Sequence, residues 1–326
     1  MKKVILAYNR VSPQVIEELE KEFEVVYFEN NEYLDDPRFV QTLQKATGVI
    51  GLGLNVTKEL LDLAPTLKII SNVSVGYDNL PLEELSKRGI MATNTPDVLN
   101  DTTADAIFGI LIAAARRMTE LDHYVKSGAW TELLPPELFG LDVHHKKLGI
   151  IGMGRIGQAI AKRGHFGFDM EILYHNRSRR PDVEELLNAH YVSMDELLAE
   201  SDFVCLMVPA SLETKNLISY GEFSKMKRTA IFINGSRGQN VDEEALYDAL
   251  QNGTIWAAGT DVFKEEPLPA HHKLLTCKNL VTLPHIGSST AETEHKMSVV
   301  AAKNLQAGLK GQQPPNLLNP NIFLNQ

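Results

Sequence analysis

The amino-acid sequence predicts an α/β protein that contains two doubly wound units, each built on a parallel sheet. Short apolar runs of strand length alternate with amphipathic helical runs from the first residues onwards. This alternation favours parallel strands with helices on both faces of the sheet. It begins again near Leu148, after a long helical segment, and 326 residues are enough for two domains.

Composition excludes several classes of function. The chain is 44% hydrophobic and 23% charged, as is usual for a globular protein. Its net charge of -10 argues against a nucleic-acid partner, because such proteins concentrate Lys and Arg. No apolar run approaches the length of a membrane span, and the run after Lys3 is too short for a secretory signal. We therefore expect a cytoplasmic protein with neither a nucleic-acid nor a membrane partner.

The first hundred residues form a domain-sized unit in this interpretation. We expect its strands at 4–8, 24–28, 48–52, 67–72 and 90–93, and its helices at 13–23, 37–45, 57–64 and 82–88. Ser12 stands at the N-cap position of the first helix and Pro13 in its first turn, where these residue types are favoured. Gly89 is expected to end the last of these helices.

A single long helix is expected over residues 101–126, and Ser127 with Gly128 interrupts it. The loop at 130–141 that follows carries several apolar side chains that we expect to be exposed. Such a loop serves either as a contact between subunits or as packing on its own domain. The sequence leaves both interpretations open.

The second alternation contains the remaining elements. We expect strands at 148–151, 171–174, 203–208, 230–234, 255–261 and 280–284, and helices at 155–163, 194–200, 242–251 and 290–309. The two cysteines, Cys205 and Cys277, match no metal-ligand spacing, and Cys205 lies within an apolar strand. We expect that thiol to behave as a small buried apolar group.

A glycine motif, G-x-G-x-x-G, joins the first strand and the first helix of this second alternation. Gly152 permits a tight turn, Gly154 lets the backbone approach a pyrophosphate, and Gly157 lets the helix pack closely on the strand. The phosphates then lie at the positive N-terminus of the helix. In this context of strand, turn and helix, the motif predicts a dinucleotide site of the Rossmann type.

Three later strands end close to residues that carry chemistry. Ligands of open parallel sheets bind beyond the carboxyl ends of the strands. Arg237, Asp261 and His285 follow three of these ends, and Glu266 comes shortly after Asp261. We therefore expect a guanidinium, an imidazole and a carboxylate to meet at one edge of the sheet.

These residue types suit the reduction of a carbonyl group by a nicotinamide cofactor. The cofactor supplies the hydride, and the protein supplies orientation, charge and a proton. His285 is a suitable proton donor, and Glu266 beside it would stabilise the imidazolium. Arg237 could hold a substrate carboxylate through two parallel hydrogen bonds. Each of the three also has a purely structural interpretation, and their spacing alone does not decide between the two.

Two other residue patterns, a possible hydrolase motif and two histidine pairs, do not support a function. Ser236 suggests a hydrolase, but Asn234 stands where the nucleophile motif G-x-S-x-G requires glycine. The adjacent histidine pairs at 144–145 and 271–272 lack the spacing of metal ligands, and we interpret them as solvated loops. No metal site is expected.

Taken together, the motifs resemble those of the D-2-hydroxyacid dehydrogenases over nearly the whole chain. The most similar branch comprises the glyoxylate/hydroxypyruvate reductases, which include 2-ketogluconate reductases. The segments that carry the resemblance are 74–79 (SVGYDN), 142–145 (DVHH), 152–157 (GMGRIG), 232–238 (FINGSRG), 261–267 (DVFKEEP) and 284–288 (PHIGS).

The resemblance implies roles for individual residues. Arg237, Glu266 and His285 are the expected catalytic set, with His285 as the proton donor in reduction. The backbone N–H groups of Val75 and Gly76, together with Arg237, are expected to bind the substrate carboxylate. The expected cofactor contacts are Thr103, Gly152, Gly154, Arg155, Ile156, Gly157, Asn176, Arg177, Ser178, Pro209, Ser236, Asp261, His285 and Gly287. Asp261 is similar to the acid that orients the nicotinamide amide.

The family architecture implies how the chain is divided. A substrate-binding domain is expected to comprise residues 1–99 and 287–326, and a dinucleotide-binding domain, residues 100–286, is inserted into it. Members of the family usually act as homodimers, so a second copy of the chain is the expected protein partner.

One departure from the family pattern bears on cofactor choice. NAD-specific members carry an acid at the end of the second strand of the cofactor domain, where it binds the ribose 2′-hydroxyl. Here His175 is followed by Asn176, Arg177 and Ser178, with no acid. Arg177 can form charge-assisted bonds to a 2′-phosphate, each contributing about 1.5–3 kcal/mol. We therefore expect NADPH to be preferred, with NADH also possible.

The sequence thus predicts an NAD(P)H-dependent reductase of small 2-keto acids that yields D-2-hydroxy acids. Glyoxylate, hydroxypyruvate and 2-ketogluconate are the candidate substrates. Two alternatives remain at this stage. One is an NAD-dependent D-lactate or phosphoglycerate type of dehydrogenase, and the other is a non-enzymatic dinucleotide sensor similar to corepressors of this fold.

Overall fold

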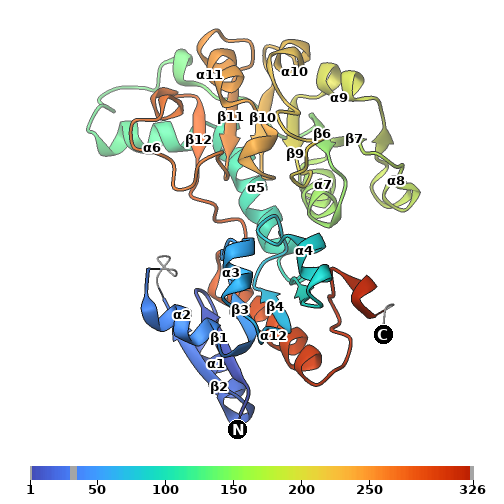
Figure 1. Cartoon of the computed structure of the whole chain (residues 1–326). Coiled ribbons are helices and arrows are strands. Elements are labelled where there is room, and N and C mark those ends of the chain that lie inside the picture. The colour runs from blue at the N-terminus through green and yellow to red at the C-terminus, as the bar shows by residue number, and fades with distance from the viewer. Residues whose placement is uncertain (1, 30–34, 324–326) are drawn as a thin grey trace. The chain divides into compact units, whose positions relative to one another are not determined.

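A computed structural model describes residues 2–29 and 35–323 of the chain. The chain divides into two compact units. Unit 1 combines the residues up to Leu99 with those from Ser289 onwards, and unit 2 comprises Asn100–Ser288. Each unit is built on a sheet of parallel strands with helices packed against it, which confirms the predicted fold class (Figure 1).

Unit 1 contains a five-stranded sheet in the order β2-β1-β3-β4-β5. Its strands are β1 Val4–Tyr8, β2 Glu24–Phe28, β3 Ala46–Gly51, β4 Ile69–Asn72 and β5 Met91–Thr93. Its helices are α1 Pro13–Glu22, α2 Pro37–Leu43, α3 Lys58–Asp62, α4 Leu82–Lys87 and α12 Ala291–Leu309, with a 3₁₀ turn η4 at Pro320–Phe323.

The C-terminal part of the chain completes unit 1. Helix α12 packs on β3 and β4, and the buried hydroxyl of Ser71 donates a hydrogen bond to the Ala301 carbonyl. The tail then runs along the edge strand β5. There the buried Asn319 accepts a hydrogen bond from Ala92 N–H and donates one to the Ile90 carbonyl, both at 2.9 Å. The tail thereby pairs with an otherwise open sheet edge.

Unit 2 contains a seven-stranded sheet in the order β12-β11-β10-β9-β6-β7-β8. Its strands are β6 Lys147–Ile151, β7 Glu171–His175, β8 His190–Tyr191, β9 Phe203–Leu206, β10 Ile231–Asn234, β11 Ala257–Thr260 and β12 Leu280–Thr282. Its helices are α5 Asn100–Ala115, α6 Met118–Lys126, α7 Arg155–Phe168, α8 Pro181–Leu187, α9 Met194–Glu200, α10 Tyr220–Lys225 and α11 Glu243–Gln251, with 3₁₀ turns η1 Pro136–Leu138, η2 Gly238–Asn240 and η3 Lys273–Thr276.

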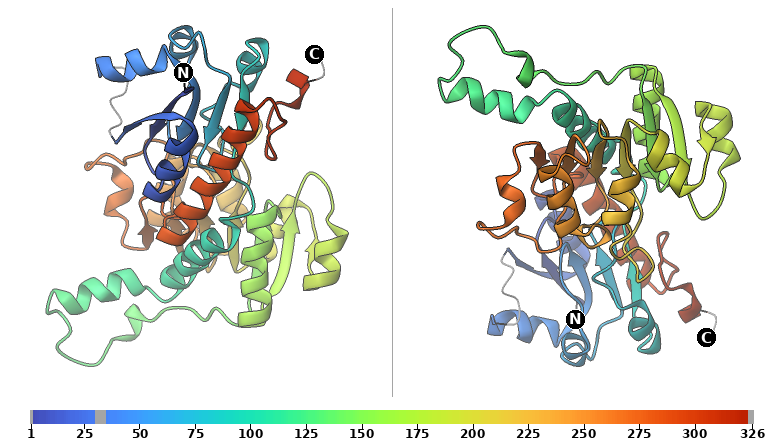
Figure 2. Two further views of the ribbon diagram at one scale, coloured as in Figure 1. Left: turned by 90° about the horizontal axis from the view of Figure 1, so that it is seen from below. Right: turned by 90° about the horizontal axis from the view of Figure 1, so that it is seen from above.

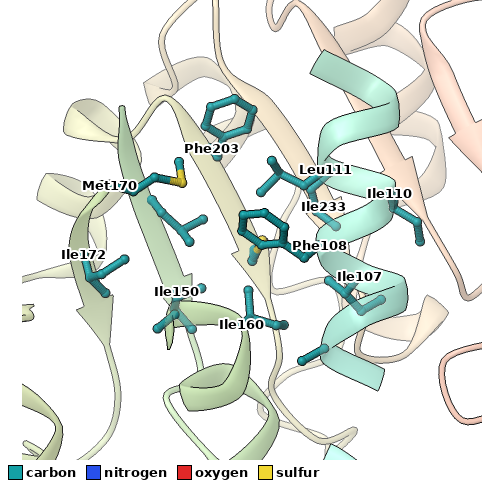
Figure 3. Packing of buried hydrophobic residues seen from close by; sticks show 14 of the residues in the cluster. Ile107, Phe108, Ile110, Leu111, Ile150, Ile160, Met170, Ile172, Phe203 and Ile233 are labelled. Atoms are coloured by element: carbon teal, nitrogen blue, oxygen red, sulfur yellow. The ribbon is translucent and has the colours of Figure 1, made fainter. Parts of the chain in front are cut away.

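The side chains of the central strands of unit 2 alternate between two apolar cores. Phe203 and Cys205 face the core that α5 and α7 cover, shown in Figure 3, whereas Val204 and Leu206 face the core under α9, α10 and α11. Both faces of a parallel sheet are thus buried, as its near-continuous apolar strands require. Cys205 is 0% exposed, and burial raises the pKa of its thiol to about 12, as expected of a small apolar residue.

The register of this sheet aligns the carboxyl ends of its central strands. Ile151 pairs with Leu206, Leu206 with Asn234, Asn234 with Thr260, and Thr260 with Thr282. These five residues therefore lie in one row across the sheet. The loops that follow them leave from the same edge, next to the reversal of strand order between β6 and β9.

The single helix predicted over residues 101–126 is wrong, because the structure contains two helices there. Helix α5 ends at Ala115, whose carbonyl accepts a hydrogen bond from Leu141 N–H at 2.8 Å. Arg117 adopts a left-handed backbone conformation with φ 53°, and its guanidinium is held by both carboxylate oxygens of Glu120. The returning chain therefore takes the place of the next helical turn.

Two smaller expectations also need correction. Ser12 is the N-cap residue of α1, as predicted, but its hydroxyl makes no capping hydrogen bond and lies 3.0 Å from His295 Nδ1 on α12. The structure also contains α8, β8 and α10, three short elements that were not predicted from the sequence. Pro181 in the first turn of α8, followed by apolar residues four apart, is a signal that would have found that helix.

Helix α6 and the segment that follows it extend from the rest of unit 2, as both views of Figure 2 show. Trp130 is 60% exposed, Leu133 92% and Phe139 56%. The loop therefore does not bury these apolar side chains within its own unit. Among the residues that the structure describes, no helix is both long and apolar enough to cross a membrane.

Candidate active site

The carboxyl edge of the unit 2 sheet gathers almost all the residues that the sequence singled out there. Pro209 follows β9, Ser236 and Arg237 follow β10, Asp261 follows β11, and His285 follows β12. The glycine turn follows β6, and Asn176 to Ser178 follow β7. Thr103 is the exception, since it lies on α5. Val75 and Gly76 belong to unit 1, where they follow β4.

The glycine turn has the geometry that the motif predicts. Gly152 has φ 103°, a conformation that L side chains rarely adopt. A Cβ on Gly157 would lie 2.3 Å from the Gly152 carbonyl oxygen, so close packing of α7 on β6 requires glycine. A Cβ on Gly154 would meet no atom within 4 Å. Helix α7 begins at Arg155, and Asn176 Oδ1 accepts a hydrogen bond from Met153 N–H at 2.7 Å.

His285 and Glu266 form a direct pair. His285 Nδ1 lies 2.8 Å from Glu266 Oε2, so Nδ1 carries the hydrogen that the carboxylate accepts, and Nε2 remains for another partner. The other carboxylate oxygen, Oε1, accepts a hydrogen bond from Phe263 N–H at 2.8 Å. The His285 side chain is 49% exposed and that of Glu266 36%. The pair is thus oriented by the protein yet open to a small molecule.

Arg237 is brought to this pair by a close backbone contact. A Cβ on Gly238 would lie 1.9 Å from the Phe263 carbonyl carbon, so only glycine lets the Arg237 loop lie against the loop of Glu266. Arg237 Nη1 donates a hydrogen bond to the Ser236 carbonyl at 2.8 Å. The positive charge of Arg237 also acts on Glu266 and lowers the pKa of its carboxyl.

The pKa of Glu266 results from opposing effects. Partial burial raises it, because a carboxylate loses hydration. The hydrogen bonds from His285 and from Phe263 N–H, with the charges of His285 and Arg237, outweigh burial and hold the pKa below its usual value. Glu266 is therefore an anion at neutral pH and serves as a fixed negative charge beside the imidazole.

Asp261 anchors the loop that carries His285. It is 2% exposed, and its two carboxylate oxygens accept hydrogen bonds from Ile286 N–H and Gly287 N–H, both at 2.8 Å. Burial raises the pKa of Asp261 above its usual range, although these two bonds lower it. His285 has φ 56°, which turns the chain sharply between β12 and these two amides. Thr103 lies against Gly287. A Cβ added to Gly287 would be 3.1 Å from the methyl carbon of Thr103.

The loop after β7 contains three arginines in different environments. Arg179 makes a bidentate pair with Glu184, from Nε to Oε1 and from Nη2 to Oε2, and Arg180 pairs with Asp182 at 2.8 Å. Arg177 is exposed, and the described part of the chain provides no carboxylate partner for it. Of these three cations, Arg177 is therefore the one left for an anion from outside the protein.

Sequence reasoning missed the residues that shape these loops. Asn234 Oδ1 accepts hydrogen bonds from both N–H and Oγ of Ser236, and its Nδ2 donates to the Arg237 carbonyl. The fully buried Asn240 donates to Ser236 Oγ and to the Val208 carbonyl. Tyr174 Oη accepts a hydrogen bond from Arg180 N–H and donates one to Glu184. A polar residue at the end of an apolar strand is a signal that would have found Asn234, whereas Asn240 and Tyr174 do not stand at strand ends.

The histidine pairs remain outside this site. His144 and His145 are exposed, with their Nδ1 atoms 2.8 Å apart, and His272 lies 3.5 Å from Glu243. Within residues 2–29 and 35–323, no three His, Cys, Asp or Glu side chains are grouped so that they could hold a metal ion.

Comparisons with known proteins give consistent findings. The family model described as "D-isomer specific 2-hydroxyacid dehydrogenase, NAD binding domain" matches residues 108–287. A probable 2-ketogluconate reductase of Dictyostelium discoideum is 46% identical over 322 residues, which cover 98% of this chain and 96% of that protein. A glyoxylate/hydroxypyruvate reductase B of Klebsiella pneumoniae is 45% identical, with 99% of this chain and 100% of that protein covered.

A solved structure shows the same architecture. It is an NADPH-dependent glyoxylate/hydroxypyruvate reductase from Sinorhizobium meliloti, in complex with NADP and malonate. It superposes with a TM-score of 0.86 at 32% sequence identity, and the match covers 98% of this chain and 97% of that one.

The geometry of the His285–Glu266 pair predicts how Glu266 titrates. Carbon-13 NMR of the Glu266 carboxyl should give a midpoint below the ordinary value of 4.5, because its hydrogen bonds favour the anion. In the His285→Gln variant, the Glu266 carboxyl should titrate at a higher pH than in the wild type. The hydrogen bond from His285 is then lost, so less remains to oppose the rise in pKa that burial causes. A wild-type midpoint above 4.5 would contradict the geometry described for this pair.

Proposed function

The chain belongs to the D-isomer specific 2-hydroxyacid dehydrogenases, and we propose that it is an NADPH-preferring reductase converting small 2-keto acids to D-2-hydroxy acids. The family is the one that the sequence motifs predicted. The observation that carries the proposal is the His285–Glu266 pair, at 2.8 Å, beside Arg237 on the sheet edge that also bears the glycine turn. Glyoxylate, hydroxypyruvate and 2-ketogluconate are the proposed substrates, as the names of the relatives suggest.

Arg237 is proposed to bind the keto acid. Its planar guanidinium can donate parallel hydrogen bonds to a carboxylate and polarise the adjacent carbonyl oxygen. The close contact at Gly238 limits how far the Arg237 loop can move away from Glu266. The backbone N–H groups of Val75 and Gly76 are proposed to bind the same carboxylate.

His285 is proposed to deliver the proton. As the carbonyl is reduced, negative charge develops on its oxygen, and a nearby imidazolium N–H stabilises that charge and then protonates it. Because Nδ1 is occupied by Glu266, Nε2 is the donor. Glu266 stays anionic throughout and stabilises the imidazolium form before the transfer.

The residues around the glycine turn fit a dinucleotide. The turn at Gly152, the N-terminus of α7 and the space beside Gly154 would accept the pyrophosphate. When bound, the nicotinamide supplies the hydride. Asp261 would contribute by holding the loop of His285 and Gly287, and Thr103, Ile156, Pro209 and Ser236 would contact the cofactor from the surrounding loops.

The preference for NADPH is proposed from the loop after β7. A cation at this position favours a 2′-phosphate, and Arg177 is the arginine of this loop for which the described residues provide no carboxylate partner. Asn176 and Ser178 would add neutral donors. An NAD-dependent D-lactate or phosphoglycerate type of dehydrogenase, the closer rival, would bind NADH more tightly. A dinucleotide sensor would bind the cofactor without turnover.

A homodimer is proposed from the apolar surface on α6 and the segment after it. A hollow of about 680 Å³ is lined there by Leu121, Tyr124, Val125, Trp130, Thr131, Glu132, Leu133 and Leu134. Contiguous exposed apolar surface of this kind marks an association site, and a second copy in a two-fold dimer is the commonest partner.

The activity itself provides the first test. Oxidation of NADPH should depend on added glyoxylate, hydroxypyruvate or 2-ketogluconate. His285→Gln should lower kcat by about 10²- to 10⁴-fold, because it removes the acid, and should change the Kd for NADPH far less than kcat. His272→Gln is the matched control, since it changes another histidine close to a glutamate and should retain full activity. Wild-type turnover in His285→Gln would disprove the assignment, and a wild type that reduces no keto acid would favour the sensor.

Cofactor choice depends on Arg177. Arg177→Ala should raise KM for NADPH by roughly 10- to 100-fold, since a charge-assisted bond to the 2′-phosphate is lost, and should leave KM for NADH almost unchanged. Arg228→Ala removes an exposed arginine that precedes β10 and should affect neither cofactor. Equal effects on NADPH and NADH, or a wild type that favours NADH, would refute the preference.

The oligomeric state depends on Leu133. In sedimentation experiments at micromolar concentration, the wild type should be a dimer, and Leu133→Asp should shift it towards monomer because a charge would enter an apolar interface. Leu212→Asp changes an equally exposed leucine outside this surface and should remain dimeric. A wild type that sediments as a monomer would contradict the proposal.

A further inference from the structure

Three consecutive carbonyl groups after β4 each accept a hydrogen bond from a donor of unit 1. The Ser74 carbonyl accepts a hydrogen bond from Thr95 N–H at 2.9 Å. The Val75 carbonyl accepts one from Asn94 Nδ2, and the Gly76 carbonyl accepts one from Asn72 Nδ2, both at 2.8 Å. A segment without regular structure thus has each of its carbonyl oxygens assigned to a donor within unit 1.

Because the peptide bond is planar, these hydrogen bonds also fix the direction of the neighbouring N–H groups. In a planar trans peptide, the carbonyl of one residue and the N–H of the next point in opposite directions. The peptide bonds of this segment are trans. Because the carbonyls of Ser74, Val75 and Gly76 point at Thr95, Asn94 and Asn72, the N–H groups of Val75, Gly76 and Tyr77 point away from them. Backbone N–H groups directed away from these partners can donate hydrogen bonds to an anion.

The two carboxamides are themselves fixed. Asn72 is 1% exposed at the end of β4, and its amide also pairs with that of Asn79, which in turn donates to the Leu54 carbonyl at 2.8 Å. Asn94 is 7% exposed and directly follows β5. Its backbone carbonyl accepts a hydrogen bond from Asn304 Nδ2 on α12 at 3.1 Å. Rotation of either carboxamide would leave a buried polar group without a partner, which is costly.

We propose that Asn94 is a positioning residue that, through the Val75 carbonyl, aims the backbone N–H group of Gly76 at the substrate carboxylate, and that Asn72 fixes the next peptide through the Gly76 carbonyl. This inference rests on the proposed function and deepens it, because it names what makes the carboxylate site selective. The two asparagines touch no reacting atom. They act through the Val75 and Gly76 carbonyls, so their effect is confined to substrates that carry a carboxylate next to the carbonyl.

The variant that tests this directly is Asn94→Asp. Aspartate has almost the same shape as asparagine, but it places a carboxylate oxygen against the Val75 carbonyl oxygen where a donor stood. Two acceptors repel each other, so the peptide between Val75 and Gly76 should turn and misdirect the Gly76 N–H. Asn94→Ala removes the donor without adding a charge and serves as a second variant should the first fail to fold.

The measurement is a ratio between two substrates. Glyoxylate carries a carboxylate, whereas glycolaldehyde carries a hydroxymethyl group in its place. In Asn94→Asp, kcat/KM for glyoxylate should fall by roughly 10- to 100-fold, as expected when an oriented contact is misplaced. The value for glycolaldehyde and the KM for NADPH should stay near those of the wild type.

Asn319, in the C-terminal tail beside β5, provides a matched control. It is also buried, and its Nδ2 donates to the Ile90 carbonyl at 2.9 Å, so Asn319→Asp creates the same conflict between acceptors away from the Val75 loop. It should lower thermal stability but leave the ratio of the two substrates unchanged.

The outcomes separate this inference from the proposed function. A wild type that reduces no 2-keto acid refutes the proposed function. A wild type that reduces glyoxylate, together with an Asn94→Asp enzyme whose substrate ratio is unchanged, refutes only the role of Asn94. Equal losses with glyoxylate and glycolaldehyde also refute it, since they would indicate a merely structural residue.

Discussion

In unit 2, hydrogen bonding between parallel strands places Ile151, Leu206, Asn234, Thr260 and Thr282 in one row. Every loop that carries a proposed catalytic residue begins at this row. A shift of one residue in any of these strands would also exchange the residues that face the two apolar cores, so the burial of both faces stabilises the register. The packing that stabilises the sheet therefore also fixes the position of the site.

Within that frame, Glu266 connects the parts of the site. One of its oxygens orients the imidazole of His285, the other accepts the Phe263 N–H, and the charge of Arg237 acts on the same carboxylate. Gly238 brings the Arg237 loop against the Phe263 backbone, and Asp261 holds the two amides after His285. Each proposed catalytic side chain is thus supported by at least one backbone contact, which limits its movement during a reaction.

Much of the fold followed from the sequence, because strands buried on both faces are apolar along their whole length. The bounds of β1 and β2 and of α9 were predicted to the residue. The break between α5 and α6 was not, since it depends on Leu141, which lies far along the chain and binds the Ala115 carbonyl. For the site, motifs identified the residues that carry charge or lie next to the glycines. They could not identify Asn72, Asn94 or Asn234, whose roles depend on which carbonyl or hydroxyl lies opposite them.

The central claim is that guanidinium, carboxylate and imidazole act together on one carbonyl group. A crystal structure with NADPH and oxamate, an unreactive analogue of a 2-keto acid, tests it most directly. The oxamate carbonyl oxygen should lie within hydrogen-bond distance of His285 Nε2 and of an Arg237 nitrogen, while Glu266 keeps its contact with Nδ1. An oxamate carbonyl that touches neither residue, or an Arg237 side chain directed into solvent, would contradict it.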